Sequence, residues 1–232
     1  MSDRPSVFPW SAWAVHLLTA TGAIWALLAL IAVIEGDARL CFFWLGVALI
    51  VDGIDGPLAR WAHVKTRVKQ FDGAALDLIV DYLTYVFVPV MFVWQFDMLP
   101  QNLELLGCSL ILLSSLHLFA KLDMKSDDNH FVGFPGIWNV AVLYFFILET
   151  ASWTNAALVV VLIVLTFVPA KFVHPFRVER LRRVTIPMSV IWIVAVVALV
   201  YAHQESPAWA WSLLGLSSLW FAGISLWRTL RA

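Results

Sequence analysis

The sequence predicts an all-α, polytopic helix bundle in which about eight membrane-spanning helices form a single transmembrane domain over residues 1–232. Three observations support this prediction. Hydrophobic residues make up 62% of the chain, charged residues make up 13%, and the mean hydropathy is +0.85, which excludes an ordinary soluble domain. Most apolar residues fall into runs of about 20, the length at which a helix crosses a bilayer. The basic residues lie almost entirely on one side of the resulting topology.

The apolar runs define eight expected spans, and the fifth is the shortest of them. In order, they cover residues 10–34, 40–61, 71–96, 103–122, 134–151, 155–173, 184–202 and 208–229. Neither a repeat nor a low-complexity linker interrupts this succession. Cys41 and Cys108 both lie inside apolar runs and do not form a C-x-x-C metal motif. We therefore expect both cysteines to pack among apolar neighbours.

The basic residues predict how the helices are oriented. With eight spans and an inside amino terminus, every Lys and Arg except Arg39 falls on the inner side. The inner segments hold Arg4, Arg60, Lys65, Arg67, Lys69, Lys121, Lys125, Lys171, Arg177, Arg180, Arg182, Arg183, Arg228 and Arg231. This bias predicts that both termini are inside and that the loop between the second and third spans faces the cytoplasm.

Aspartates interrupt the second and third apolar runs, where charge is costly. A charged side chain at the bilayer centre costs roughly 2.5–3.5 kcal/mol, so several together need a compensating partner. Asp52 and Asp55 are three residues apart, whereas Gly73, Asp77 and Asp81 follow at steps of four. Each set lines one helix face, and a short loop brings the two faces together. The sequence therefore predicts a cluster of hard oxygen ligands suited to Mg2+, Mn2+ or Ca2+.

Each residue type in this run has a chemical use. Two pairs of aspartates can hold two cations roughly 3.5–4 Å apart, as in two-metal phosphoryl transfer. Gly56 and Gly73 would let a nucleotide approach a helix backbone. Arg60 can bind phosphate or ribose oxygens with its forked guanidinium group. Asp81, one turn beyond Asp77, can take a proton from an attacking hydroxyl.

Other interpretations of intramembrane aspartates remain open from the residues alone. Such groups also serve in proton relays, in ion-coupled transporters and as paired structural groups. A transporter commonly has two related halves, and this sequence has no second copy of the aspartate run. Asp72 stands beside the run and is expected either to cap the third span or to face the loop, with a metal role less favoured.

The full pattern is D-x2-D-G-x2-A-R-x12-G-x3-D-x3-D, over residues 52–81. It resembles the signature of the CDP-alcohol phosphotransferase family, integral membrane enzymes of phospholipid synthesis. The twelve-residue gap, the proline in "DGIDGPLAR" and the flanking "AWAVHLLTATGA", "HFVGFPGIWNV" and "KFVHPFRVERLRRVT" resemble the bacterial, choline-using branch. The rest of the family commonly has a shorter gap.

This resemblance implies that the phosphatidyl group of CDP-diacylglycerol is transferred to choline and that CMP is released. It implies two bound Mn2+ or Mg2+ ions, with Asp81 as general base. The residues that it assigns to the metals are Asp52, Asp55, Asp77 and Asp81. Those that it places against CDP are Asp52, Gly56, Ala59, Arg60 and Gly73. It also implies a bacterial inner membrane, a cytoplasmic active site and a homodimer, and it suggests nucleotide contacts at His16, Thr19 and Thr21. No nucleic-acid partner is expected.

Choline requires a different kind of site, because a quaternary ammonium is held by aromatic faces and a nearby carboxylate. The segment "DDNHFVGFPGIWN" is the best candidate. Its proposed choline residues are Asp127, Asp128, Phe131, Phe134 and Trp138. Tyr82 and Tyr85 are alternatives, and helix packing is the other interpretation for each aromatic residue. Serine, inositol or glycerol phosphate as the acceptor stays open, although these alcohols should need cationic or polar pockets.

Overall fold

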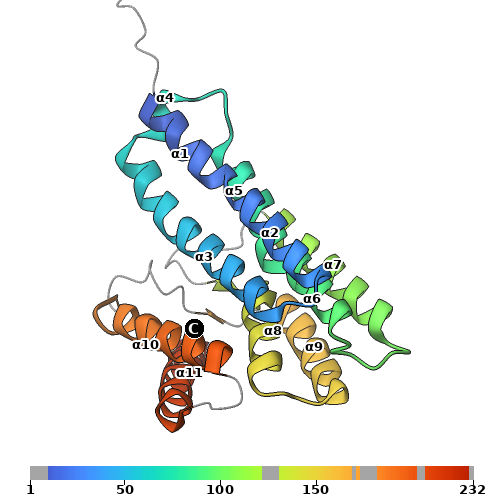
Figure 1. Cartoon of the computed structure of the whole chain (residues 1–232). Coiled ribbons are helices and arrows are strands. Elements are labelled where there is room, and N and C mark those ends of the chain that lie inside the picture. Colours follow the sequence, from blue (N-terminus) through green and yellow to red (C-terminus); the bar gives the residue numbers. More distant parts are fainter. Residues whose placement is uncertain (1–9, 122–130, 169–170, 173–181, 203–206, 230–232) are drawn as a thin grey trace, which may run out of the picture. The chain divides into compact units, whose positions relative to one another are not determined.

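The computed structural model describes residues 10–121, 131–168, 171–172, 182–202 and 207–229. The chain folds as two compact units, Met1–Val88 (unit 1) and Pro89–Ala232 (unit 2), each of which is described separately. Helices dominate both units (Figure 1).

Within the described residues, five helical runs are long and apolar enough to cross a membrane. They are Trp10–Ile34, Ala38–Trp61, Gly73–Gln95, Arg183–Ala202 and Ala208–Trp227. Three further apolar helices are shorter: Glu104–Phe119, Trp138–Ile147 and Ser152–Phe167. The eight runs fall where the sequence predicts spans. The chain is therefore a helical membrane protein.

Unit 1 is built from three long helical runs. The first is α1 (Trp10–Ala20) followed closely by α2 (Gly22–Ile34), and the second is α3 (Ala38–Trp61). A single short helix, α4 (Val64–Arg67), precedes the third run. That run consists of α5 (Gly73–Tyr82), the π-helix η1 (Leu83–Phe87) and α6 (Val88–Gln95), the last of which leads into unit 2.

Side chains at the helix starts explain where two of these runs begin. The carboxylate of Asp37 accepts a hydrogen bond from the Leu40 backbone N–H at 2.9 Å and so caps α3. The carboxylate of Asp72 accepts from the backbone N–H groups of Ala74 and Ala75 at 3.0 and 3.1 Å and caps α5. The capping alternative for Asp72 is confirmed. In both cases an aspartate satisfies amide groups that the helix itself leaves without partners.

Close packing holds the helices of unit 1 together. The α1–α2 run packs against α3 and against α5–η1. A Cβ added at Gly22 would lie 2.3 Å from Cγ1 of Val80, so α2 can approach α5 this closely only because residue 22 has no side chain. Near the loop end, an apolar cluster of Ala12, Val15, Ala62, Val64 and Val68 joins α1, the end of α3 and α4.

Unit 2 holds the remaining apolar helices. They are α7 (Glu104–Ala120), α8 (Trp138–Ile147), α9 (Ser152–Phe167), α10 (Arg182–Ala202) and α11 (Ala208–Thr229). The all-α prediction misses one detail: β1 (Phe131–Val132) pairs antiparallel with β2 (Lys171–Phe172).

The strand pair shortens two predicted spans. The fifth was expected to begin at Phe134, but α8 begins at Trp138 because Pro135 and the positive φ of Gly136 (+71°) do not fit a helix interior. The sixth was expected to reach residue 173, but α9 ends at Phe167 and the strand follows.

Polar side chains inside unit 2 bind one another. The indole N–H of Trp192 on α10 donates to the Tyr144 hydroxyl on α8 at 2.8 Å, and that hydroxyl bonds the Ser218 hydroxyl on α11 at 2.5 Å. Asn155 donates to the Met98 carbonyl at 2.9 Å. Such pairing removes the penalty of unsatisfied polar groups in an apolar bundle.

We predict that Gly22→Ala destabilises the protein, because the added methyl group would overlap Val80. Overpacking of this kind costs about 1–3 kcal/mol. Thermal unfolding in detergent should show a lower melting temperature, and Val80→Ala combined with Gly22→Ala should recover part of the loss. Gly46→Ala is the control, since a Cβ there meets nothing within 4 Å. A Gly22→Ala protein as stable as the wild type would contradict the close contact.

Candidate functional site

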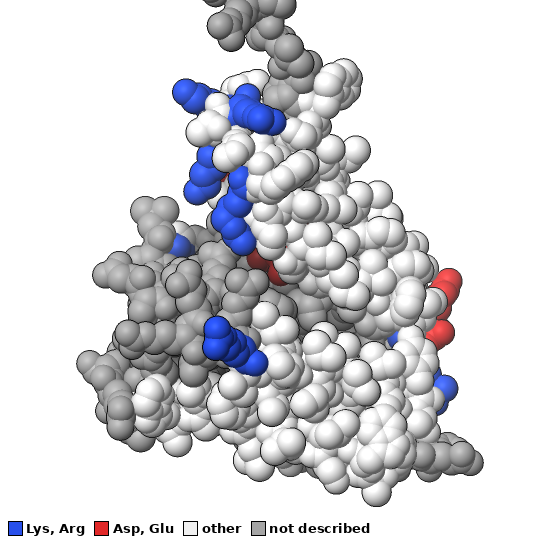
Figure 2. All heavy atoms as spheres, turned by 90° about the vertical axis from the view of Figure 1, so that its left-hand side faces the viewer, with Lys and Arg blue, Asp and Glu red and all other residues white. Residues whose placement is uncertain are grey.

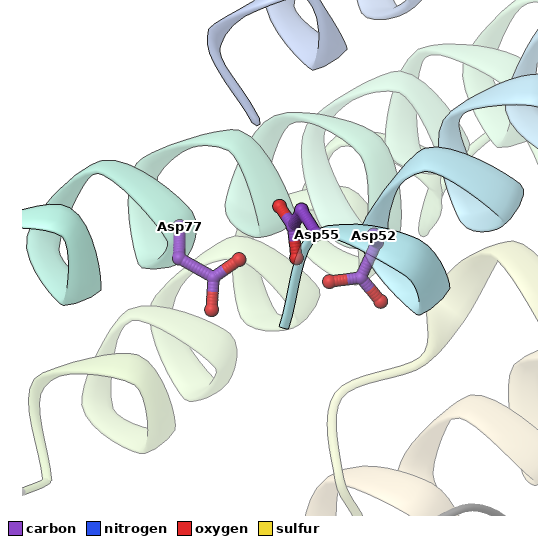
Figure 3. A group of neighbouring side chains, drawn as sticks. All are labelled: Asp52, Asp55 and Asp77. Atoms are coloured by element: carbon purple, nitrogen blue, oxygen red, sulfur yellow. The ribbon is translucent and has the colours of Figure 1, made fainter. Parts of the chain in front are cut away.

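Three aspartates from two helices meet in unit 1. One carboxylate oxygen from each of Asp52, Asp55 and Asp77 lies within 4.8 Å of the others. Asp52 and Asp55 belong to α3 and Asp77 to α5, and the three carboxylates face one another (Figure 3). Asp55 is buried at 6% exposure, whereas the other two are half-buried. The predicted convergence of the two aspartate faces is therefore confirmed for three of the four residues.

Local sequence explains why these side chains share a space. A spacing of three puts Asp52 and Asp55 on neighbouring turns of one face of α3. The chain then reverses through α4 and the segment before Gly73, so that α5 returns with Asp77 facing α3. Asp81 lies one turn farther along α5 and is not part of the three-residue group. Its predicted metal and base roles stay predictions.

Two hydroxyl groups bind the carboxylates of α3. The Tyr85 hydroxyl donates to Oδ2 of Asp52 at 2.6 Å, and Thr19 Oγ1 donates to Oδ2 of Asp55 at 2.6 Å. Thr19 comes from α1 and Tyr85 from η1, so these contacts tie all three helical runs of unit 1 to the aspartates. Hydrogen bonds to an ionised carboxylate are among the stronger ones in proteins.

The residues predicted to lie against CDP have distinct surroundings. Arg60 is exposed in the last turn of α3, and Ala59 packs against the apolar cluster of α1 and α4. A Cβ at Gly56 would meet only a guanidinium nitrogen of Arg60, at 3.6 Å, apart from its own helix backbone. A Cβ at Gly73 would lie 2.5 Å from Cε1 of His16. Gly73 therefore has a packing reason as well, because the His16 ring lies directly against its backbone.

His16 itself is buried at 5% exposure on α1. Its ring centroid lies 4.5 Å from that of Phe71 and 5.8 Å from that of Trp13. Its Nε2 atom is buried and has no hydrogen-bond partner among the described residues. A buried polar atom without a partner is uncommon in folded proteins. The expected nucleotide contact of His16 stays a prediction.

Basic side chains gather at the end of unit 1 that carries α4 (Figure 2). The four basic side chains of this loop region are exposed: Arg60, Lys65, Arg67 and Lys69. Arg67 donates to the hydroxyl of Ser11 at 3.1 Å. A basic surface of this kind attracts phosphate groups and anionic headgroups.

The predicted choline residues are only partly described. Asp127 and Asp128 lie outside the described residues, and so does the side chain of Phe131. Phe134 and Trp138 are buried in unit 2, at 5% and 1% exposure, with ring centroids 5.2 Å apart in an edge-to-face pair. The Trp138 indole N–H donates to the Ser115 hydroxyl at 2.9 Å. Of the two alternative choline residues, Tyr85 donates its hydroxyl to Asp52.

The three carboxylates fit a hard divalent cation. Oxygen donors alone make up the group, which matches Mg2+ and Mn2+ better than a softer metal. Three negative groups within 4.8 Å repel one another, and a cation between them would remove that repulsion. Asp52, Asp55 and Asp77 are the residues that would hold it.

Sequence reasoning named Thr19 and Tyr85 for other roles and missed their bonds to the aspartates. One signal pointed to Tyr85: Gly73, Asp77, Asp81 and Tyr85 continue the same step of four along the chain. No such spacing in the sequence relates Thr19 to Asp55, because the two residues are 36 positions apart.

We predict that Asp55→Asn and Asp77→Asn each weaken Mn2+ binding at least tenfold, because each removes a charged ligand. Titration of purified protein, with free Mn2+ followed by electron paramagnetic resonance, measures this. Asp72→Asn is the matched control, since asparagine also caps a helix start and Asp72 is not in the three-residue group. Equal Mn2+ affinity in Asp55→Asn, Asp77→Asn and Asp72→Asn would exclude the group as the metal site.

Comparison with known proteins agrees with the motif. No protein-family profile matches the chain. It is 47% identical to the phosphatidylcholine synthase of Pseudomonas aeruginosa over 223 residues, which cover 95% of this chain and 92% of the relative. It is also 47% identical over 195 residues to the phosphatidylcholine synthase of Bradyrhizobium diazoefficiens, with coverage of 84% and 72%. That of Borreliella burgdorferi is 36% identical over 197 residues, with coverage of 85% and 84%. The chain thus belongs to the bacterial phosphatidylcholine synthase family.

Proposed function

We propose that the protein transfers the phosphatidyl group of CDP-diacylglycerol to choline, which yields phosphatidylcholine and CMP. The observation that carries this proposal is the carboxylate group of Asp52, Asp55 and Asp77, formed by two apolar helices in a member of this enzyme family. Hard oxygen ligands on membrane-spanning helices, near the cytoplasmic surface, suit a substrate whose pyrophosphate joins a soluble nucleotide to a lipid.

The proposed reaction is a one-step, in-line displacement. Asp81 takes the proton of the choline hydroxyl, whose oxygen then forms a bond to the phosphorus that carries the lipid. The bond from that phosphorus to the bridging oxygen breaks, and CMP leaves with the electron pair. Two ions of Mn2+ or Mg2+ bound at Asp52, Asp55, Asp77 and Asp81 would neutralise phosphate oxygens during this exchange. Gly56, Ala59, Arg60 and Gly73 would lie along the CDP group.

We place this chemistry at the cytoplasmic face of a bacterial inner membrane. In this proposal eight spans, with both termini inside, form one transferase domain over residues 1–232. The basic loop side chains around α4 support the orientation, because positive charge favours the cytoplasmic side. They also suit a soluble choline substrate and a CMP product that enter and leave on that side. A homodimer is the proposed assembly.

For choline we propose Asp127, Asp128, Phe131, Phe134 and Trp138. Aromatic faces attract a quaternary ammonium, and the attraction is stronger where water is excluded. The buried edge-to-face pair of Phe134 and Trp138 supplies two such rings close together.

We predict that purified protein with CDP-diacylglycerol and Mn2+ releases CMP when choline is supplied, but not with serine, inositol or glycerol 3-phosphate. Asp81→Asn should lower the rate by about 10²–10⁴-fold, the usual contribution of a general base. Mn2+ binding to this variant distinguishes the two proposed roles of Asp81. Unchanged Mn2+ affinity indicates loss of the general base, whereas lowered affinity indicates loss of a metal ligand. Release with a different alcohol would overturn the choline assignment, and release with none would overturn transferase activity.

We predict that Phe134→Leu raises KM for choline several-fold and leaves KM for CDP-diacylglycerol unchanged. Leucine keeps most of the apolar volume but has no aromatic face to attract the cation. Phe43→Leu is the control, because Phe43 is 47% exposed on α3. An unchanged KM for choline in a folded Phe134→Leu protein would remove Phe134 from the choline site.

A further inference from the structure

The hydroxyl groups of Thr19 and Tyr85 both donate to aspartates on another helix. Hydroxyls inside helices of this protein commonly bind a carbonyl of their own helix, as Thr84 does with the Val80 carbonyl at 3.1 Å. Thr19 also has the Val15 carbonyl within 3.3 Å, yet its shorter contact, at 2.6 Å, is with Asp55. A hydrogen bond to an ionised carboxylate is stronger than one to a neutral carbonyl, which accounts for this preference.

Packing restricts the side chain of Thr19. It is buried at 7% exposure on α1, which packs against both α3 and α5. A β-branched side chain in a helix has few rotamers, so the direction of its hydroxyl follows from the placement of the helix. Thr19 therefore holds Oδ2 of Asp55 from the helix opposite.

Tyr85 lies in the π-helix η1. Residues four apart overshoot one α-helical turn of 3.6 residues, so a step-of-four series drifts around the helix. Asp77, Asp81 and Tyr85 form such a series, and η1 begins at Leu83, just before the tyrosine. A π-helix has more residues per turn than an α-helix, so a step of four drifts less through η1. Tyr85 is 9% exposed there and reaches Asp52.

Each bond occupies Oδ2, one of the two oxygens of its carboxylate. Ca2+ takes six to eight oxygen ligands and often uses both oxygens of one carboxylate, whereas Mg2+ requires a compact octahedron. An oxygen that already accepts a short hydrogen bond is a poorer second ligand for the same ion. A carboxylate held in this way is suited to binding a cation through one oxygen.

We propose that Thr19 and Tyr85 are positioning residues that restrict Asp55 and Asp52 to one-oxygen ligation, and that they favour Mn2+ and Mg2+ over Ca2+. The inference rests on the proposed function in one respect, because it takes the three aspartates as the cation site. It concerns the hydroxyl donors, which lie outside the sequence motif.

The test measures cation binding without lipid or choline. Purified protein in detergent is titrated with Mn2+, free Mn2+ is followed by electron paramagnetic resonance, and Ca2+ affinity is obtained by competition. Tyr85→Phe and Thr19→Val each remove one hydroxyl at nearly constant volume. We expect Mn2+ affinity to fall about 10–100-fold, the usual effect of losing such a partner, and Ca2+ affinity to fall less, so that the Mn2+/Ca2+ ratio drops.

Three variants serve as controls. Thr19→Ser keeps the hydroxyl and should restore the wild-type ratio. Tyr201→Phe removes an exposed tyrosine hydroxyl on α10, and Thr66→Val removes an exposed threonine hydroxyl on α4, so both should bind as the wild type does. If Thr19→Val does not fold, Thr19→Cys replaces it, because a thiol is a small but weaker donor.

An unchanged affinity in folded variants, an equal loss for both ions or a wild-type protein that binds no Mn2+ would overturn the inference. A simple structural defect would lower both affinities alike, which is why the ratio is the deciding quantity. A different result would contradict the proposed function without contradicting this inference. Wild-type protein that shows this Mn2+ pattern but releases no CMP with choline would overturn the transferase assignment and leave the positioning roles intact.

Discussion

Three carboxylates brought within 4.8 Å of one another in apolar helices are the constraint on which unit 1 depends. Each charge loses hydration there, and each repels the other two. Hydrogen bonds from Thr19 and Tyr85 offset part of this cost, and a bound cation would offset most of the rest. A folded state with these groups together is therefore one that is built to receive positive charge. A cation held by these three residues would therefore also stabilise the folded state.

The distance between helices decides whether the carboxylates can share a ligand, and glycines set that distance. Gly22 lets α2 lie against Val80 of α5, and Gly73 lets the His16 ring lie against the start of the same helix. In a bilayer there is little hydrophobic drive between helices, so small residues and close contact take its place. Gly73 is thus constrained by packing on α1 whatever it does for the nucleotide. Helix packing and the chemistry of the site depend on the same positions.

Unit 2 also contains polar side chains among apolar helices. Its helices pair polar side chains internally, through Tyr144 with Trp192 and through Trp138 with Ser115. Its two-residue strand pair, Phe131–Val132 with Lys171–Phe172, pairs backbone groups outside the helices. The buried rings of Phe134 and Trp138 belong to this ordered interior. Their edge-to-face contact packs the two rings against each other.

The sequence by itself determined the helical membrane class, the positions of the apolar helices and the aspartate faces. These are local properties, because hydropathy and residue spacing depend only on near neighbours along the chain. Only the tertiary structure decided which three aspartates come within 4.8 Å of one another and that His16 lies on Gly73. It also decided that Thr19 binds Asp55 and that Tyr85 binds Asp52. The two hydroxyl contacts join residues 36 and 33 positions apart, so they depend on the distance and rotation between packed helices, which no spacing along one helix records.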